Sequence, residues 1–430
     1  MNPIRLLRPA ALLAALVCVA PLCGQTIREE VLRPVEHSAG SSMAYRFEAA
    51  PQTPAPEGYR PFYIGHFGRH GSRYHTTEHI YRKFRDLFAE ADRTGALTPL
   101  GRDVRQRMDT IFARCDGHAG VLTPRGEEEH RAIAGRMYDN YPEVFAPSAD
   151  GRRVRIFARS TSVERVVLSM RAFDAELARR APHLKVEEAP GGAHNAYLNH
   201  YTPEYKEYYR DGAWRAIYER QREQWIAPER LVASLFGDGE FVRRRIAGQR
   251  NFMTELFSLA SILQDCPVDE TLYDLFTDDE IYALWRLQNL NQYLRKGPSA
   301  LAGELAASIA RPLLRDLLAC ADAAVAGDAP AADLRFGHGE GLMPLAALMR
   351  LEGACGAERD PEQVELAWQD FRITPMAGNI QWILYRNAQS DVLVKFLLNE
   401  RETRIPIRSA TGLYYRWRDV RRFYARIARD

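Results

Sequence analysis

One kind of sequence unit, present three times, constrains the fold of this chain most. Each unit has a short apolar run, then a polar loop, then a stretch whose apolar residues recur with helical spacing. The apolar runs are residues 62–67, 154–158 and 334–337; the helical stretches begin near residue 76, include residues 166–173 and span residues 342–351. Units of this kind are typical of an open α/β sheet, which binds ligands at the carboxyl ends of its strands. We therefore expect the three loops to converge, although they are far apart in the sequence.

The segment between the second and third units has a different character. Residues 190–325 are rich in Tyr, Trp, Arg and Glu, show helical periodicity in places such as 240–259, and carry few strand signals. Residues 380–385 and 392–398 are expected strands, and 414–429 an expected closing helix. We predict an α/β fold with a mixed, mostly parallel sheet flanked by helices. Residues 25–189 and 326–430 should form this catalytic domain, with a mostly helical inserted domain at 190–325.

The first residues are typical of an export signal. Arg5 and Arg8 precede an apolar run over residues 10–22, and Cys23-Gly24-Gln25 leads into a polar region. The run is too short to span a bilayer as a helix. We expect residues 1–24 to be removed near Gly24 and the mature protein to be periplasmic or secreted, without a membrane span. A lipid anchor on Cys23 is an alternative that the preceding Ala20-Pro21-Leu22 disfavours.

The charge balance excludes recruitment of a substrate by net charge. The chain has 58 Lys and Arg against 56 Asp and Glu, and removing Arg5 and Arg8 leaves 56 against 56. An anion site must therefore come from local clustering, and no basic footprint for nucleic acid is present. The four cysteines that remain allow three full pairings and include no CxxC spacing for zinc: Cys115, Cys266, Cys320 and Cys355.

The first loop carries the strongest sign of chemistry. Arg69 and Arg73 flank His70 on a turn that contains Gly71, at the end of an expected strand. Guanidinium groups match the geometry of phosphate oxygens, and glycine lets the backbone approach a ligand closely. The loop therefore predicts a phosphate site.

Several motifs resemble those of one enzyme superfamily. Residues 69–73 (RHGSR) resemble the Arg-His-Gly-x-Arg signature of histidine acid phosphatases. Residues 336–345 (FGHGEGLMPL) resemble the Phe-Gly-His-Ala-Glu-x-Leu-x-Pro-Leu segment of its multiple inositol polyphosphate phosphatase branch (branch 2). The strand end at Arg159, followed by Ser162, Arg165 and Ser169, is similar to the family's arginine-bearing strand end. Residues 74–76, 122–126 and 397–400 also resemble shared segments.

The resemblance implies roles for particular residues. His70 would be the nucleophile that forms a phosphohistidine, and Glu340 the general acid and later the base that activates water. The residues implied to hold the phosphate are Arg69, Arg73, Arg159 and His338. The implied substrate is a small phosphate monoester such as the inositol polyphosphate phytate, and the implied protein is a monomer that uses no metal or other cofactor. Glu340 stands where the phytase branch has Asp, which favours the multiple inositol polyphosphate phosphatase branch.

Alternatives remain open at this point. A broad-specificity acid phosphatase would carry the same motifs, while a catalytically inactive phosphate-binding module need keep neither nucleophile nor acid. A phosphoglycerate mutase shares the Arg-His-Gly loop, but export and the helical insert argue against it. Gly339 replaces the Ala of the family segment, which should loosen the backbone and puts positional selectivity in doubt.

Structural explanations also compete for single residues. Arg159 can pair with Glu164, and His338 can be a core histidine. His75 and His79 have metal-binding spacing without an evident third ligand. His66 is expected to be structural or to lie at the site rim, and His194-Asn195 to form a loop.

Overall fold

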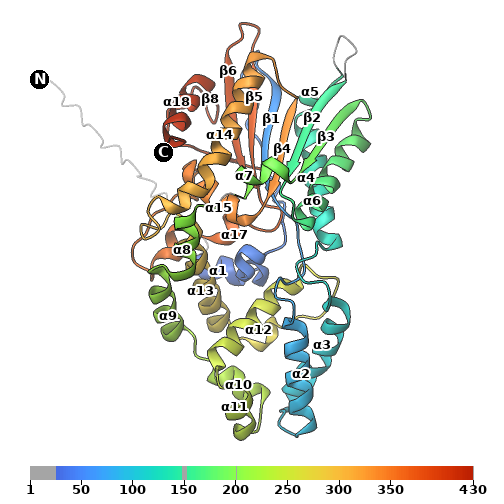
Figure 1. Cartoon of the computed structure of the whole chain (residues 1–430), viewed down its shortest axis with the longest axis vertical. Helices are drawn as coiled ribbons and strands as arrows, with labels where there is room; N and C mark the ends of the chain where they lie inside the picture. The colour runs from blue at the N-terminus through green and yellow to red at the C-terminus, as the bar shows by residue number, and fades with distance from the viewer. Residues whose placement is uncertain (1–25, 148–152, 200, 430) are drawn as a thin grey trace, which may run out of the picture.

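A computed structural model describes residues 26–147, 153–199 and 201–429 (Figure 1). The expected signal peptide, with Arg5, Arg8 and Cys23, lies outside these residues. Within them, no helix has both the length and the apolar composition needed to cross a membrane.

The core of the fold is an eight-stranded mixed sheet with the order β3-β2-β4-β1-β5-β6-β7 and β8 beside β6. Neighbours from β3 to β1 are parallel, whereas β5 is antiparallel to β1 and to β6, so five strands run the same way. The strands are β1 Arg60–Arg69, β2 Val154–Ser160, β3 Leu184–Pro190, β4 Ala332–Gly337, β5 Asn379–Arg386, β6 Val392–Leu398, β7 Arg401–Thr403 and β8 Tyr415–Arg416. The strands expected from the three sequence units are confirmed.

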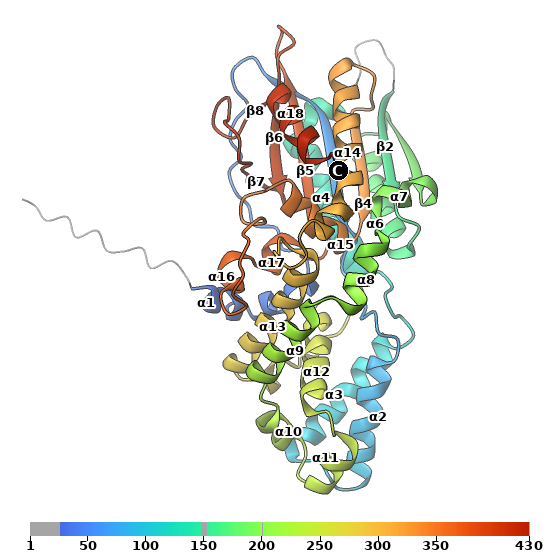
Figure 2. The same cartoon turned by 60° about the vertical axis from the view of Figure 1, so that its left-hand side comes forward.

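Helices cover both faces of the sheet (Figures 1 and 2). Alternate residues of each strand point to opposite faces, so Ile64 packs in one core and Tyr63 and Phe67 in the other. The first core includes α4 Pro124–Asn140, α5 Pro142–Phe145 and α6 Glu164–Arg180. The second includes α14 Leu305–Ala326, α15 Gly339–Leu348 and α18 Trp417–Ile427. The closing helix is shorter than expected, because residues 415–416 pair with β6 as β8.

A helical body lies below the carboxyl edge of the sheet in Figure 1. Its apolar core joins α2 Ile80–Arg93 and α3 Pro99–Cys115 to α10 Glu229–Leu235, α11 Gly239–Arg245, α12 Gln249–Leu263 and α13 Asp278–Lys296. The expected helical stretch 240–259 is two helices with a break at residues 246–248. Because α2 and α3 precede residue 190, the helical body is larger than the expected insert, whose exact bounds stay a prediction.

The remaining helices are short and connect these parts. In the described part of 191–331 every named element is a helix, as expected for the insert, and Phe236 adds only an isolated bridge to Leu97. The connecting helices are α1 Ile27–Leu32, η1 Val35–Ser42, η2 Gly192–His194, α7 Asn195–Leu198, α8 Pro203–Asp211, α9 Trp214–Trp225, η3 Tyr273–Leu275, α16 Val364–Ala367 and α17 Asp370–Ile373.

The start of one helix differs from expectation. α2 begins at Ile80 rather than near 76, because the Thr77 N–H donates to Nδ1 of His75 in a turn that precedes the helix. At the start of α6, Val163 is the N-cap residue and makes no side-chain cap. The Thr161 hydroxyl instead lies 3.2 Å from Nε2 of His338.

The strand register brings the three loops together. Arg69 at the end of β1 is opposite Gly337 of β4, and Ser160 at the end of β2 is opposite Phe336. All three strands are parallel, so their loops leave the same edge of the sheet, facing the helical body. The expected convergence is confirmed.

Candidate active site

His70 is held by the backbone directly after β1. Its N–H donates to the Gly337 carbonyl at 3.0 Å, and its own carbonyl accepts from the Ala377 N–H at 2.9 Å. The ring Nδ1 lies 2.9 Å from the Gly71 carbonyl. A carbonyl can only accept, so Nδ1 carries the proton and Nε2 keeps its lone pair. The imidazole is therefore oriented with Nε2 available as a nucleophile.

Close backbone contacts fix the loop that follows. A Cβ on Gly71 would lie 2.3 Å from the Gly126 carbonyl oxygen, so only glycine fits there. Gly126 belongs to the first turn of α4, where its N–H donates to the capping hydroxyl of Thr123. The segments 69–73 and 122–126, which both resemble shared family segments, thus lie against each other. This close contact explains why residues 71 and 126 are glycines.

Two buried acids anchor Ser72 of the same loop. The Ser72 hydroxyl lies 2.7 Å from Glu129 Oε1 and 3.0 Å from Asp265 Oδ1. A hydroxyl has one proton to donate, so one carboxyl must itself be protonated. Burial raises the pKa of both acids, and burial first and the Glu129 charge second raise that of Asp265 well above its usual value. Glu129 also accepts the backbone N–H groups of Ser72 and Tyr45, which favours its ionised form. Asp265 therefore carries the proton, and the pair adds less negative charge beneath the loop than two carboxylates would.

Arg69 and Arg73 present charge to a cavity at this edge. Nη1 of Arg69 donates to the carbonyls of Ser41 at 2.5 Å and Thr374 at 2.6 Å, while Nη1 of Arg73 donates to the Tyr74 carbonyl at 3.0 Å. The Nε atoms of both are buried without a protein partner among the described residues. Neither guanidinium is hydrogen-bonded to a carboxylate of the described residues, so both keep donors for an anion.

The surrounding charges keep His70 neutral. Burial and then the guanidiniums of Arg69, Arg165 and Arg73 hold its pKa well below the usual 6.5. His338 stands beside it, with ring centroids 5.7 Å apart. Burial lowers the pKa of His338 to about 4. Both rings are therefore uncharged in mildly acidic solution, as expected for a nucleophilic imidazole.

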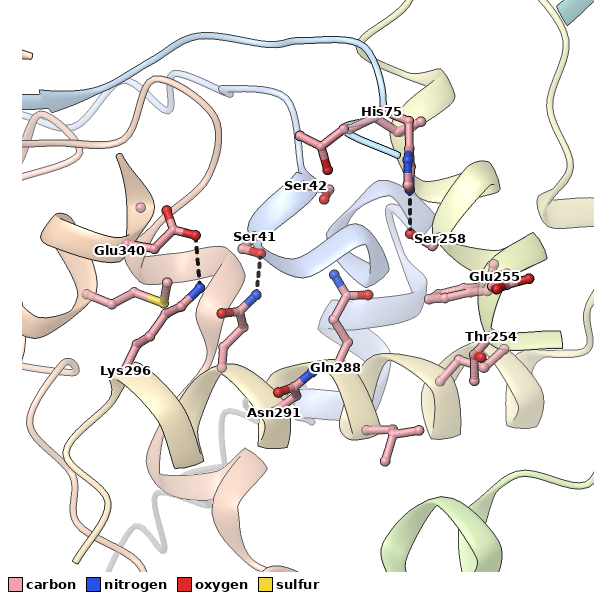
Figure 3. A pocket seen from close by; sticks show the side chains of 18 of the residues that line it. Ser41, Ser42, His75, Thr254, Glu255, Ser258, Gln288, Asn291, Lys296 and Glu340 are labelled. Carbon is pink, nitrogen blue, oxygen red and sulfur yellow. Dashed lines mark hydrogen bonds and ion pairs between the residues drawn. The ribbon is translucent and has the colours of Figure 1, made fainter. Parts of the chain in front are cut away.

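Glu340 lies in the first turn of α15, directly after the loop that carries His338. Its carboxylate accepts a hydrogen bond of 3.0 Å from Nζ of Lys296, the last residue of α13 (Figure 3). Lys296 first, and then His338 and Arg69, hold the pKa of Glu340 well below its usual value. The expected acid thus faces the site as a carboxylate paired with a lysine.

Gly339 is tightly packed rather than loose. A Cβ there would lie 3.1 Å from Oγ1 of Thr374 and 3.3 Å from Nε of Arg69. Its φ is not in the left-handed region, so space rather than backbone conformation explains the glycine. This close packing argues against the expected loosening of the backbone at Gly339.

Arg159 is the one expected site residue that the structure does not bring to His70. It lies within β2, and its side chain points to the sheet face covered by α14. There it pairs with Asp333 and, at 3.3 Å, with Asp316. Although burial opposes its charge, these acids raise the pKa of Arg159. The expected phosphate role of Arg159 is therefore wrong. The alternative of a structural ion pair is correct, with Asp333 and Asp316 as partners in place of Glu164.

Arg165 occupies the place expected for Arg159. It stands in the first turn of α6, and its charge lowers the pKa values of both His70 and His338. Its Nε is buried without a partner among the described residues, and its Nη1 is 3.5 Å from the Gly120 carbonyl. Ser169 connects α6 to the loop of residues 69–73, because its hydroxyl accepts the Gly71 N–H at 3.1 Å. The first turn of a helix that follows a strand faces the sheet edge, and this signal could have identified Arg165.

Two adjoining cavities meet at Glu340 and Lys296. One, of about 410 Å³, is also lined by Arg69, Arg73 and His75, with Gln288 and Asn291 of α13 on its wall (Figure 3). The other, of about 450 Å³, is also lined by Arg165, His338, Tyr201, Tyr205 and Lys206. Basic side chains outnumber the acids Glu255 and Glu340 in these walls. The anion site thus arises from local clustering in a chain of nearly balanced charge.

The remaining candidate residues have structural contacts. His66 is buried against Phe173 and Phe336, His75 lies 3.1 Å from the Ser258 hydroxyl, and Asn195 accepts the Ser162 N–H. Among the described residues, no group of three potential ligands is placed to hold a metal. The four cysteines there are free thiols: Cys115, Cys266, Cys320 and Cys355.

Solved structures share this fold. The Bifidobacterium longum multiple inositol polyphosphate phosphatase in complex with inositol hexasulfate matches with a TM-score of 0.75 and 20% identity, over 89% of this chain and 96% of that chain. The phytase from D. castellii matches with a TM-score of 0.66 and 15% identity, over 91% and 85%. The Hafnia alvei phytase apo form gives 0.53 and 13%, over 87% and 98%. A scan against protein-family models found no match, and neither did a search of the curated proteins. The chain therefore has the fold of these phosphatases, and the predicted fold class is confirmed.

Proposed function

We propose that this protein is an exported phosphatase that hydrolyses phosphate monoesters of inositol polyphosphates such as phytate. The observation that carries the proposal is a neutral imidazole, that of His70, oriented with Nε2 free and surrounded by three guanidiniums. A phosphate monoester resists attack because its oxygens are negatively charged, and guanidiniums neutralise that charge and orient phosphorus.

The proposed reaction has two steps. Nε2 of His70 attacks phosphorus, a P–N bond forms, and the P–O bond to the inositol breaks. Protonated Glu340 gives its proton to the leaving oxygen. Water then attacks the phosphohistidine with Glu340 accepting its proton, the P–N bond breaks, and phosphate leaves. Arg69, Arg73, Arg165 and His338 hold the phosphoryl oxygens in both steps.

The shape and charge of the site support a substrate with several phosphates. A small monoester needs only the cations around His70. The two adjoining cavities add Lys296, which lines both, and Lys206, which lines one of them, and cations beyond the first phosphate are useful only for a polyanion. The solved structure of the Bifidobacterium enzyme with inositol hexasulfate, a polyanion of that shape, agrees with this choice.

Turnover on phytate and on a panel of small monoesters at acid pH tests the proposal. We expect a higher kcat/KM for phytate, and a His70→Ala variant that folds normally but loses at least about 10⁴-fold in kcat. A preference for the small esters would favour a broad-specificity acid phosphatase. Retained turnover in His70→Ala would mean that the nucleophile is misassigned.

A further inference from the structure

A buried lysine contacts the expected general acid, although the two reaction steps assign it no role in proton transfer. Lys296 ends α13, where the carbonyl end of a helix favours a cation. Its side chain is 5% exposed, whereas that of Glu340 is 42% exposed, and the two are joined at 3.0 Å. Among the described residues, Glu340 is the one hydrogen-bond partner of the ammonium. A general acid must carry a proton, yet this partner favours its ionised form.

The position of the pair suggests how the conflict is resolved. Lys296 and Glu340 line both cavities, so ligand phosphates on either side would lie near the ammonium. A phosphate oxygen is a competing acceptor for Nζ, and its negative charge also offsets that of the nearby guanidiniums. Both effects make a carboxylate easier to protonate. Substrate binding can thus change the protonation state of Glu340 without moving any helix.

Other groups also face the pair. The guanidiniums of Arg69, Arg73 and Arg165 disfavour protonation of Glu340 in the empty site. Arg295 acts on Lys296, whose pKa it lowers, the ring of His338 is uncharged above about pH 4, and the phenols of Tyr201 and Tyr205 lie nearby. Because the three guanidiniums are also the proposed phosphate ligands, a bound phosphate offsets their charge as well as that of Lys296.

We propose that Lys296 is a positioning residue for Glu340, which it holds as an aimed carboxylate in the empty site and releases to take a proton from solvent when substrate phosphates bind. The proposal rests on the proposed function. It makes proton uptake part of substrate binding and gives a structural reason for activity at acid pH.

Lys296→Met tests the proposal through the pH dependence of kcat/KM. Glycerol 2-phosphate has a poor leaving group that needs the acid, whereas p-nitrophenyl phosphate does not. For glycerol 2-phosphate, activity falls as pH rises and Glu340 loses its proton. Removing a cation at this distance should shift this falling limb of the pH profile of kcat/KM to higher pH, by about one pH unit or more. The limb for p-nitrophenyl phosphate should stay in place, and Lys296→Arg should restore the wild-type profile.

The controls separate positioning from a structural effect. Met keeps the aliphatic volume of Lys, and Glu340 stays in contact with water, so the variant should fold. Lys185→Met removes an exposed lysine paired with Glu187 at 2.9 Å, far from the site, and should leave both profiles unchanged. Equal losses on both substrates at every pH, or an unmoved limb, would overturn the proposal.

A second measurement does not depend on Lys296→Met folding. In the His70→Ala protein, calorimetry of phytate binding in buffers of different ionisation enthalpy should show uptake of close to one proton near pH 5. That uptake should disappear in His70→Ala/Glu340→Gln, and its persistence there would contradict the proposal. If the proposed function failed, His70→Ala would keep hydrolytic activity. If only this inference failed, His70→Ala would be inactive while Lys296→Met kept the wild-type profile.

Discussion

Two groups of arginines lie close to the same strands and differ in their counter-charges. On the sheet face under α14, Arg159 pairs with Asp333 and Asp316, and Nε of Arg335 lies 2.5 Å from the same Asp316. At the carboxyl edge, the guanidiniums around His70 have no hydrogen-bonded carboxylate within the part of the chain that the structure describes.

The difference separates structural arginines from ligand-binding ones. In the first group two arginines are balanced by two aspartates. The Tyr63 hydroxyl also donates a hydrogen bond of 3.0 Å to Asp333. The second has surplus positive charge and cavities beside it. A buried surplus of charge is costly unless an anion offsets it. The surplus, rather than the number of arginines, distinguishes the proposed phosphate site.

The largest expected effect concerns the acid that faces the surplus charge. Glu340→Gln cannot donate a proton, so kcat on glycerol 2-phosphate should fall about 10²–10⁴-fold. With p-nitrophenyl phosphate the first step should be nearly unaffected, because its leaving group needs no proton. Comparison of the two substrates checks this, and equal losses would count against the acid role.

Replacing one arginine of each group tests the comparison itself. Arg165→Met should lower kcat/KM about 10²-fold and weaken inhibition by inorganic phosphate, with little change in Tm, because it removes one anion ligand. Arg159→Met should instead cost about 3–5 kcal/mol of unfolding free energy, because it leaves Asp333 buried and unpaired. Steady-state kinetics and denaturant unfolding of both variants distinguish an anion ligand from a structural ion pair. A catalytic defect in a stably folded Arg159→Met protein would reverse the two assignments.

Buried histidines away from the site should control acid stability. Burial lowers the pKa values of His66 and His130 to about 3, against 6.5 in the unfolded chain. Between those values the unfolded state binds more protons, so their contribution is complete above pH 6.5 and is lost as pH falls. Each should lower the unfolding free energy by about 2 kcal/mol at pH 5 relative to pH 7.

The variant His130→Leu gives the control for this effect. Unfolding in urea at pH 5 and pH 7 should show a smaller acid loss in the variant than in the wild-type protein. If the two proteins lost the same free energy between these pH values, His130 would not be a source of the acid sensitivity.

The smallest expected effect concerns the glycine beside Arg69. In Gly339→Ala the added Cβ would press on Nε of Arg69 and Oγ1 of Thr374, and a shift of Arg69 by a few tenths of an ångström should follow. We expect a loss of about 1 kcal/mol in transition-state stabilisation, or about fivefold in kcat/KM. Steady-state kinetics on phytate measure it, and an unchanged or higher kcat/KM would show that the packing tolerates Ala.

The sequence predicted what depends on local pattern. The strand before His70 and the helix that bears Glu340 follow from apolar spacing, and parallel strands then bring their loops to one edge. Arg159 was misassigned because side chains alternate between sheet faces, so a residue inside a strand points to a face rather than to the edge. Lys296 was missed because its contact with Glu340 depends on how α13 docks, over a separation of 44 residues, and no spacing in the sequence records that.

A crystal structure of the protein with inositol hexasulfate bound tests the central claim most directly. The account predicts one sulfate beside Nε2 of His70, held by Arg69, Arg73 and Arg165, with other sulfates extending into the two cavities and Arg159 still paired with Asp333. A sulfate bound by Arg159, or an empty position beside His70 with the ligand elsewhere, would contradict it.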